Sequence, residues 1–223
     1  IWKDSYTAIR RVNEILANID RIPEIDAELK ARLIAEARFH RAYHYNYLVN
    51  LYGDVPLVLE PISIEDARQV SRTPRAQVVD QILQDFDAAI AVLPQSYDEE
   101  DDFGRATKGT ALAYKARAAL WDSRWQDAAD AAWQVMQLGE YTLHPDYAEL
   151  TRYAGDGSDE IIYADRRAEN IRAQGAFNAL GPRSLEASSD FTRSYDCRAP
   201  VHRLAWNNVS ARASSFAAYA ASR

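Results

Sequence analysis

Residues 107–139, TKGTALAYKARAALWDSRWQDAADAAWQVMQLG, decide the fold of this chain. Thr107 is a good N-cap and Gly139 suits the end of a helix, so helical structure is expected between them. The connection around Arg124 is only a few residues long, which predicts two antiparallel helices, over 107–123 and 125–138. Alanines crowd both halves, and small side chains let two helices approach closely.

This pattern is typical of a tetratricopeptide-type helical hairpin, although the full repeat consensus is absent. In such a hairpin the large side chains cover the neighbouring pair of helices. We therefore expect the large aromatic residues on the helical stripes to lie in the core, namely Phe86, Tyr114, Trp121 and Trp133.

Three further helices are predicted upstream, because apolar residues recur there at the spacing of one helical face. They run over residues 2–20, over about 23–51 with Arg41 on the apolar stripe, and from Thr73-Pro74 to the residue before Pro94. The turn Tyr52-Gly53-Asp54-Val55-Pro56 separates the second helix from an irregular segment, since Gly and Pro are strong helix breakers. We interpret this turn as structural and not as part of a ligand site.

Helical periodicity ends after Tyr141. Turn residues over 155–159 precede one short β-like run, Glu160-Ile161-Ile162-Tyr163-Ala164. The sequence therefore predicts an all-α fold. Tetratricopeptide-like helical hairpins form the body over 2–140, and the loop-rich C-terminal part beyond it contains a short strand.

Composition excludes several classes of protein. The chain has 223 residues and a formal charge of -7, so a general nucleic-acid binder is disfavoured. No apolar run approaches the length of a transmembrane helix. The single cysteine, Cys197, excludes an intrachain disulfide framework and a cysteine-rich zinc site. The chain begins Ile1-Trp2-Lys3-Asp4, without Met or a signal peptide, so we expect either a mature segment or a fragment.

The sequence offers little for catalysis or metal binding. Glu36, His40 and His44 share one helix face and could hold a divalent metal, but a packed face with ion pairs explains them better. The acidic run over 98–102 lacks the Gly and the spaced ligands of an EF-hand, and a solvated loop is the better interpretation. No nucleophile elbow, phosphate-binding loop or dinucleotide fingerprint is present. We predict no enzyme activity, no cofactor and no metal.

Aromatic residues are the one suggestive excess, with 13 Tyr and 5 Trp. Their flat apolar faces and polar edges suit stacking on sugar rings, although exposed aromatic residues also mark protein interfaces. The best ligand candidates are those expected in loops or near the terminus: Trp2, Tyr6, Tyr97 and Phe103.

Several local patterns together resemble the SusD/RagB family of outer-membrane nutrient-uptake lipoproteins. In chain order they are Trp2-x3-Tyr6-x2-Ile9-x3-Asn13; EARFHRAY over 36–43; Tyr52-Gly53-Asp54-Val55-Pro56-Leu57; Arg72-x-Pro74 leading to Asp85 and Leu93-Pro94; Gly104-Arg105-Ala106-Thr107; Gly139-x-Tyr141-x-Leu143; and Asp159-Glu160-Ile161-Ile162-Tyr163. The resemblance covers residues 2–165, and more weakly 181–195. It departs from the family at Ala35 and His40, where Gly and Leu are usual.

The resemblance implies a division into a SusD-like helical region over 1–165 and an irregular, incomplete ligand-binding region with an atypical tail over 166–223. The lipid-bearing N-terminal cysteine of the family is absent, and Cys197 cannot replace it. Family members capture glycans, sometimes peptides, and pass them to a SusC-type TonB-dependent transporter. The implied place is the extracellular face of the outer membrane, with a lipid anchor in the full-length protein.

Two functions remain open from the sequence. The resemblance implies a non-enzymatic component of nutrient uptake that binds a polysaccharide or oligosaccharide. This is the leading hypothesis, and its alternative, based on the helical hairpins alone, is a tetratricopeptide-like scaffold that binds only protein and has no glycan ligand.

Overall fold

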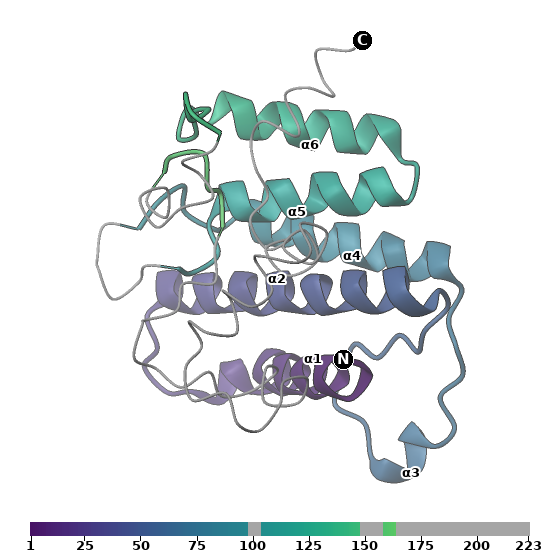
Figure 1. The fold of residues 1–223 in the computed structure, drawn as a ribbon. Helices are drawn as coiled ribbons and strands as arrows, with labels where there is room; N and C mark the ends of the chain where they lie inside the picture. The colour runs from purple at the N-terminus through teal and green to yellow at the C-terminus, as the bar shows by residue number, and fades with distance from the viewer. Residues whose placement is uncertain (98–103, 148–157, 164–223) are drawn as a thin grey trace, which may run out of the picture.

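The computed structural model describes residues 1–97, 104–147 and 158–163. Its helices are α1 (Trp2–Asn18), the 3-10 helix η1 (Ile19–Arg21), α2 (Ala27–Tyr52), α3 (Ile64–Ala67), α4 (Arg75–Ile90), α5 (Lys108–Trp121) and α6 (Trp125–Gln137). The longer helices stack side by side with alternating direction, α2 lying between α1 and the pair α4 and α5 (Figure 1). The prediction of an all-α body is confirmed.

Helix α5 and helix α6 form the antiparallel hairpin that the sequence predicts. The Thr107 hydroxyl accepts a hydrogen bond from the Thr110 amide at 3.2 Å and so caps α5. Gly139 follows α6 with a φ of +72°, as expected of a residue that ends a helix. The alanines meet in the interface and are almost fully buried: Ala113, Ala116, Ala118, Ala119, Ala128, Ala131 and Ala132.

The aromatic core is only partly as predicted. Phe86 and Tyr114 are buried and pack with Phe39, which confirms two of the four core assignments. The other two are wrong, since Trp121 is 57% exposed and Trp133 is 55% exposed. Trp121 is the last residue of α5, beyond the packed turns, and Trp133 lies on the outer face of α6, which no described element covers.

A buried ion pair joins the N-terminal helices. Arg41 of α2 donates to both carboxylate oxygens of Asp85 of α4, at 2.7 and 2.8 Å. The same guanidinium donates to the side-chain oxygen of Asn13 of α1 and to the carbonyl of Leu59, each at 3.1 Å. Three helices and one connecting segment therefore meet at a single side chain.

The turn after α2 is held by its own backbone geometry and by contacts with the start of α4. Gly53 has a φ of +72° and a ψ of -120°, a conformation that side chains disfavour. Asp54 accepts a hydrogen bond from the Arg75 amide at 2.8 Å and so satisfies the first turn of α4. Val55 is fully buried and forms an isolated antiparallel bridge with Thr73.

Residues 56–60, which we call the strap, return along α1 and α2. The Tyr45 hydroxyl donates to the Val58 carbonyl at 2.9 Å and accepts from the Val58 amide at 2.7 Å. Asn13 donates to the same carbonyl at 3.0 Å, and the Tyr6 hydroxyl donates to the Pro56 carbonyl at 2.8 Å. The helices thus supply the polar partners that a segment without regular structure needs.

Several boundaries differ from those predicted. Helix α2 begins at Ala27 and not at Pro23, because the Asp26 carboxylate caps the amides of Glu28 and Leu29. Helix α4 has Pro74 as its N-cap, since Thr73 is engaged in the bridge to Val55. The four-residue helix α3, capped by Ser63, lies in a segment expected to be irregular.

The short strand predicted over 160–164 is not seen in its described part, residues 160–163, where Glu160 lies in a turn and Ile161 forms only a single β-bridge. Ile162 instead packs into the α5–α6 cluster, and its carbonyl accepts from the Thr110 hydroxyl at 3.4 Å. Nearby, the ring of Tyr141 covers Gly109 of α5 so closely that a side chain there would collide with it. The predicted region 166–223 lies outside the described residues, and no described helix is long and apolar enough to cross a membrane.

Gly53→Ala is expected to destabilise the protein by about 1 kcal/mol or more, through backbone strain alone. A Cβ at this position would meet nothing within 4 Å, so no clash contributes to the loss. Urea denaturation measures the change, and an unchanged midpoint would contradict it. Ligand affinity of the folded fraction should stay the same if the turn is purely structural.

Arg41→Met is expected to cost about 3–5 kcal/mol, because it leaves the Asp85 carboxylate buried without its ion-pair partner. The double variant Arg41→Met with Asp85→Leu removes both charges and should recover part of that loss. Chemical denaturation of the two single variants and the double variant completes the cycle. Additive losses would show that the two side chains do not depend on each other.

Candidate functional site

Two of the four predicted ligand residues lie together at one end of the helical stack. Trp2 and Tyr6 are one turn apart on α1, with ring centroids separated by 5.0 Å. Because α1 and α2 are antiparallel, the start of α1 meets the end of α2, where Tyr52 contacts Trp2 edge to face at 4.9 Å. Trp2 is 37% exposed and Tyr52 is 42% exposed. We call Trp2, Tyr6 and Tyr52 the aromatic cluster.

Contacts of Tyr6 with the strap and with the buried core hold the aromatic cluster in position. The Tyr6 hydroxyl is tied to the Pro56 carbonyl, and its ring packs edge to face against the buried Tyr45 at 6.4 Å. Burial raises the pKa of Tyr6 well above its ordinary value, with the nearby Tyr45 acting in the same direction. The phenol therefore stays a neutral hydrogen-bond donor, and the cluster presents fixed ring surfaces to solvent.

Tyr97 lies elsewhere. Its hydroxyl is within hydrogen-bond distance of Glu36 at 3.3 Å and of the Ala106 carbonyl at 3.1 Å, and Arg32 lies over its ring. Burial, and next the Glu36 carboxylate, raise the pKa of Tyr97 to about 12. Glu36 and Tyr52 are 16 positions apart on α2, about 24 Å along the helix, so Tyr97 is not part of the aromatic cluster. Phe103 lies outside the described residues.

The helix face with Glu36, His40 and His44 has the packed character that the sequence favoured over a metal site. Glu36 is engaged by Arg105, with Nη1 at 3.0 and 3.1 Å from its two carboxylate oxygens, and by Tyr97. Burial lowers the pKa of His40, against the opposing effect of Glu36. Within the described residues, no group of three or more His, Cys, Asp or Glu side chains is arranged to hold a metal ion. The acidic run over 98–102 falls outside them.

Comparison with known proteins identifies the family. A family model described as starch-binding and associating with the outer membrane matches residues 1–120, more than half of the chain. The chain belongs to this SusD-like family, which confirms the resemblance found in the sequence. A SusD-like protein of Formosa agariphila is 32% identical over 180 residues, which are 81% of this chain and 34% of that protein.

Solved structures support the same fold. A SusD-like protein from Bacteroides fragilis superposes with a TM-score of 0.70 and 32% identity, over 77% of this chain and 34% of that one. A laminarin-binding SusD-like protein gives a TM-score of 0.68 and 31% identity, over 73% of this chain and 36% of that one. The chain therefore spans about a third of the length of the relatives it matches.

Tyr52 is the member of the aromatic cluster that sequence reasoning missed. It opens the turn over 52–56, which was interpreted as purely structural. The predicted antiparallel pairing of the first two helices could have identified Tyr52. In such a pair, the last residue of one helix must lie beside the first residues of its neighbour. Only the Trp2–Tyr6 spacing of one helical turn is visible within a single segment.

His44 is expected to titrate with a pKa of about 4, lowered first by burial and then by the nearby His40. The unfolded chain, with a His pKa of about 6.5, binds a proton between these values that the folded chain does not. Protonation of His44 therefore does not reduce the free energy of unfolding above pH 6.5. As the pH falls from 6.5 toward 4, the free energy of unfolding decreases. NMR titration of the imidazole measures the pKa, and His44→Gln should flatten the pH dependence of stability in that window. A pKa near 6.5 would contradict the prediction.

Proposed function

We propose that this chain is the helical part of a non-enzymatic glycan-binding protein of the outer-membrane surface. The family description, starch-binding and associating with the outer membrane, supports both the ligand class and the place. A relative that is 31% identical binds laminarin, so a neutral glucan is the first ligand to test. The sequence contains no catalytic motif that would add turnover to binding.

The observation that carries the proposal is the exposed aromatic cluster. Trp2 and Tyr52 are 37% and 42% exposed and pack edge to face. Tyr6 packs on Trp2, and its hydrogen bond to the Pro56 carbonyl holds it in place. Sugar rings present apolar C–H faces with hydroxyls at their edges, which such surfaces accommodate. A rigid cluster also loses little conformational entropy when it binds.

The proposal extends to place and partner. The full-length protein would be lipid-anchored on the extracellular face of the outer membrane, where it captures a polysaccharide or oligosaccharide. It would pass this ligand to a SusC-like TonB-dependent transporter. Family membership supports these points, and co-purification of the full-length protein with an adjacent transporter would test them.

Trp2→Ala is expected to weaken binding of laminarihexaose by about tenfold or more, equivalent to about 1.4 kcal/mol of lost stacking. Trp2→Phe keeps an aromatic ring and should retain part of the affinity. Isothermal titration calorimetry measures each dissociation constant, and chromatography of the recovered ligand should find no shortened products.

Ile15→Ala is the matched control, because Ile15 is an exposed apolar residue of the same helix outside the aromatic cluster. It should bind like the unmodified protein. Equal losses in Ile15→Ala and Trp2→Ala would show that the cluster is not the ligand surface. Absence of binding to any neutral glucan would instead favour the protein-binding scaffold.

A further inference from the structure

We propose that an elongated glycan chain lies across the ends of α1, α2, α4, α5 and α6, along a surface that continues the aromatic cluster to Trp121 and Trp125. We call this the helix-end surface and define it by Trp2, Tyr52, Arg75, Trp121 and Trp125. The inference rests on the proposed function and adds a second group of exposed aromatic residues, Trp121 and Trp125. We call the aromatic cluster and this second group the two aromatic stations. Its consequence is a preference for long glycans over short ones.

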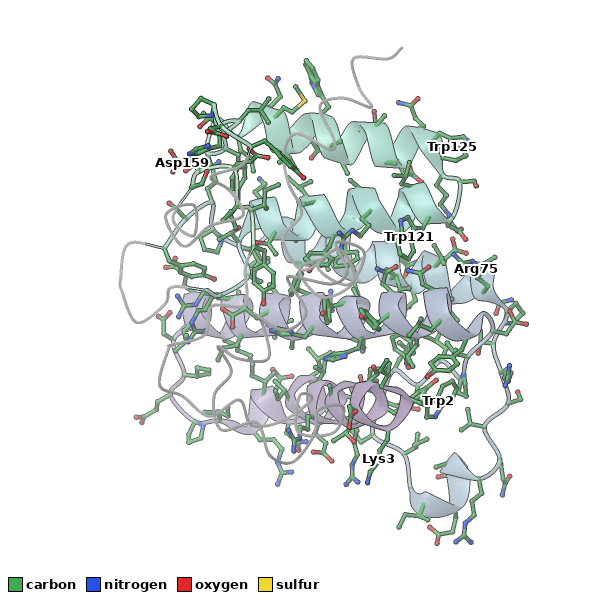
Figure 2. All side chains as sticks on the ribbon, viewed as in Figure 1. Trp2, Lys3, Arg75, Trp121, Trp125 and Asp159 are labelled. Carbon is green, nitrogen blue, oxygen red and sulfur yellow. The ribbon has the colours of Figure 1, made fainter. Side chains whose placement is uncertain are left out.

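Topology places these residues on one side of the molecule. The helices alternate in direction, so the start of α1, the end of α2, the start of α4, the end of α5 and the start of α6 share one edge. Figure 2 shows Trp2, Arg75, Trp121 and Trp125 along that edge. Trp121 and Trp125 flank the tight turn of the α5–α6 hairpin, and both are about half exposed.

A hydrogen-bond network centred on Arg75 lies between the two aromatic stations. Tyr52 contacts Trp2 and follows Asn50 by two positions, and the Asn50 side-chain oxygen accepts from Arg75 at 3.3 Å. Arg75 also donates to the Val49 carbonyl at 2.9 Å and to Asp122 at 3.1 Å.

Asp122 in turn lies next to Trp121 in the chain and accepts a hydrogen bond from Arg124 at 3.1 Å. Arg124 is held on its other side by Asp80 at 2.6 Å and immediately precedes Trp125. The polar groups between the stations are therefore fixed in place before any ligand arrives.

The order of chemistry along the helix-end surface favours a glycan over a protein partner. The centre of a protein interface is depleted of charged residues, and its polar groups lie at the rim. Here the arrangement is reversed, because aromatic rings lie at both ends and the Arg75–Asp122 network lies in the middle. A hydroxyl-rich chain can stack on the rings and exchange hydrogen bonds with that network.

Size also favours a long ligand. Neighbouring helix axes lie about 8–10 Å apart, and the path from α1 through α2, α4 and α5 to α6 takes four such steps. A glycan that contacts both aromatic stations must therefore contain several sugar units. A short oligosaccharide can occupy the aromatic cluster alone.

The experiment compares a polymer with a short oligosaccharide of the same glucan, using the 223-residue chain. Affinity electrophoresis through gels containing laminarin or starch measures polymer binding, and calorimetry with the matching trisaccharide measures short-chain binding. The variants are Trp121→Ala, Trp125→Ala and Trp2→Ala. Trp133→Ala is the matched control, because Trp133 is as exposed as Trp121 but lies two turns along α6, away from the edge.

Trp121→Ala and Trp125→Ala should weaken polymer binding by about tenfold and leave trisaccharide binding unchanged. Trp2→Ala should weaken both, and Trp133→Ala neither. Trp121→Ala, Trp125→Ala and Trp133→Ala should keep the melting temperature, since about half of each side chain is exposed. If Trp121→Ala and Trp125→Ala bind polymer normally while Trp2→Ala does not, the helix-end surface is overturned and the proposed function stands. If the unmodified chain binds neither laminarin nor starch, both proposals fail.

Discussion

The buried ion pair between Arg41 and Asp85 is the interaction on which the N-terminal half of the structure depends. A guanidinium taken out of water needs acceptors for its N–H groups, and here they come from α1, α4 and the strap. The positions of these elements relative to α2 are therefore coupled through one side chain. Asn13, which receives one of these bonds, also donates to the strap at Val58. The position of the aromatic cluster depends on the same strap, because the Tyr6 hydroxyl donates to the carbonyl of Pro56, two residues before Val58.

Local signals in the sequence predicted most of the helices, and their failures have physical causes. Thr107 was recognised as a cap because its amide partner is three residues away in the same segment. At α4 the N-cap is Pro74, because the backbone of Thr73 pairs with Val55, which is distant in sequence. Trp121 and Trp133 fit an apolar stripe, yet a stripe does not reveal whether another helix covers it. The predicted strand failed similarly, since Ile162 found its partners on helices.

Only those residues of the candidate site that are close together in the sequence could be predicted to lie together. Trp2 and Tyr6 are neighbours on one helix, and that spacing can be read directly. Tyr52 and the hairpin tryptophans join them only because alternating helices bring distant segments to the same edge. Tyr97 lies apart from them, and its hydroxyl contacts Glu36 and Ala106, so its ligand role stays a prediction. A stack of antiparallel helices thus concentrates surface chemistry at its ends, which periodicity within single helices does not describe.

The close packing of Tyr141 on Gly109 has an evolutionary consequence. A methyl group at position 109 would overlap the Tyr141 side chain, so a change at 109 requires the tyrosine, far away in the chain, to shift or to be replaced. Among homologous sequences, a larger residue at 109 should appear together with a smaller one at 141. The Tyr141 hydroxyl also lies 3.4 Å from the Thr107 hydroxyl that caps α5, so the same substitution would disturb the start of that helix. Covariation of positions 107, 109 and 141 would therefore record how the segment after the hairpin is fastened to it.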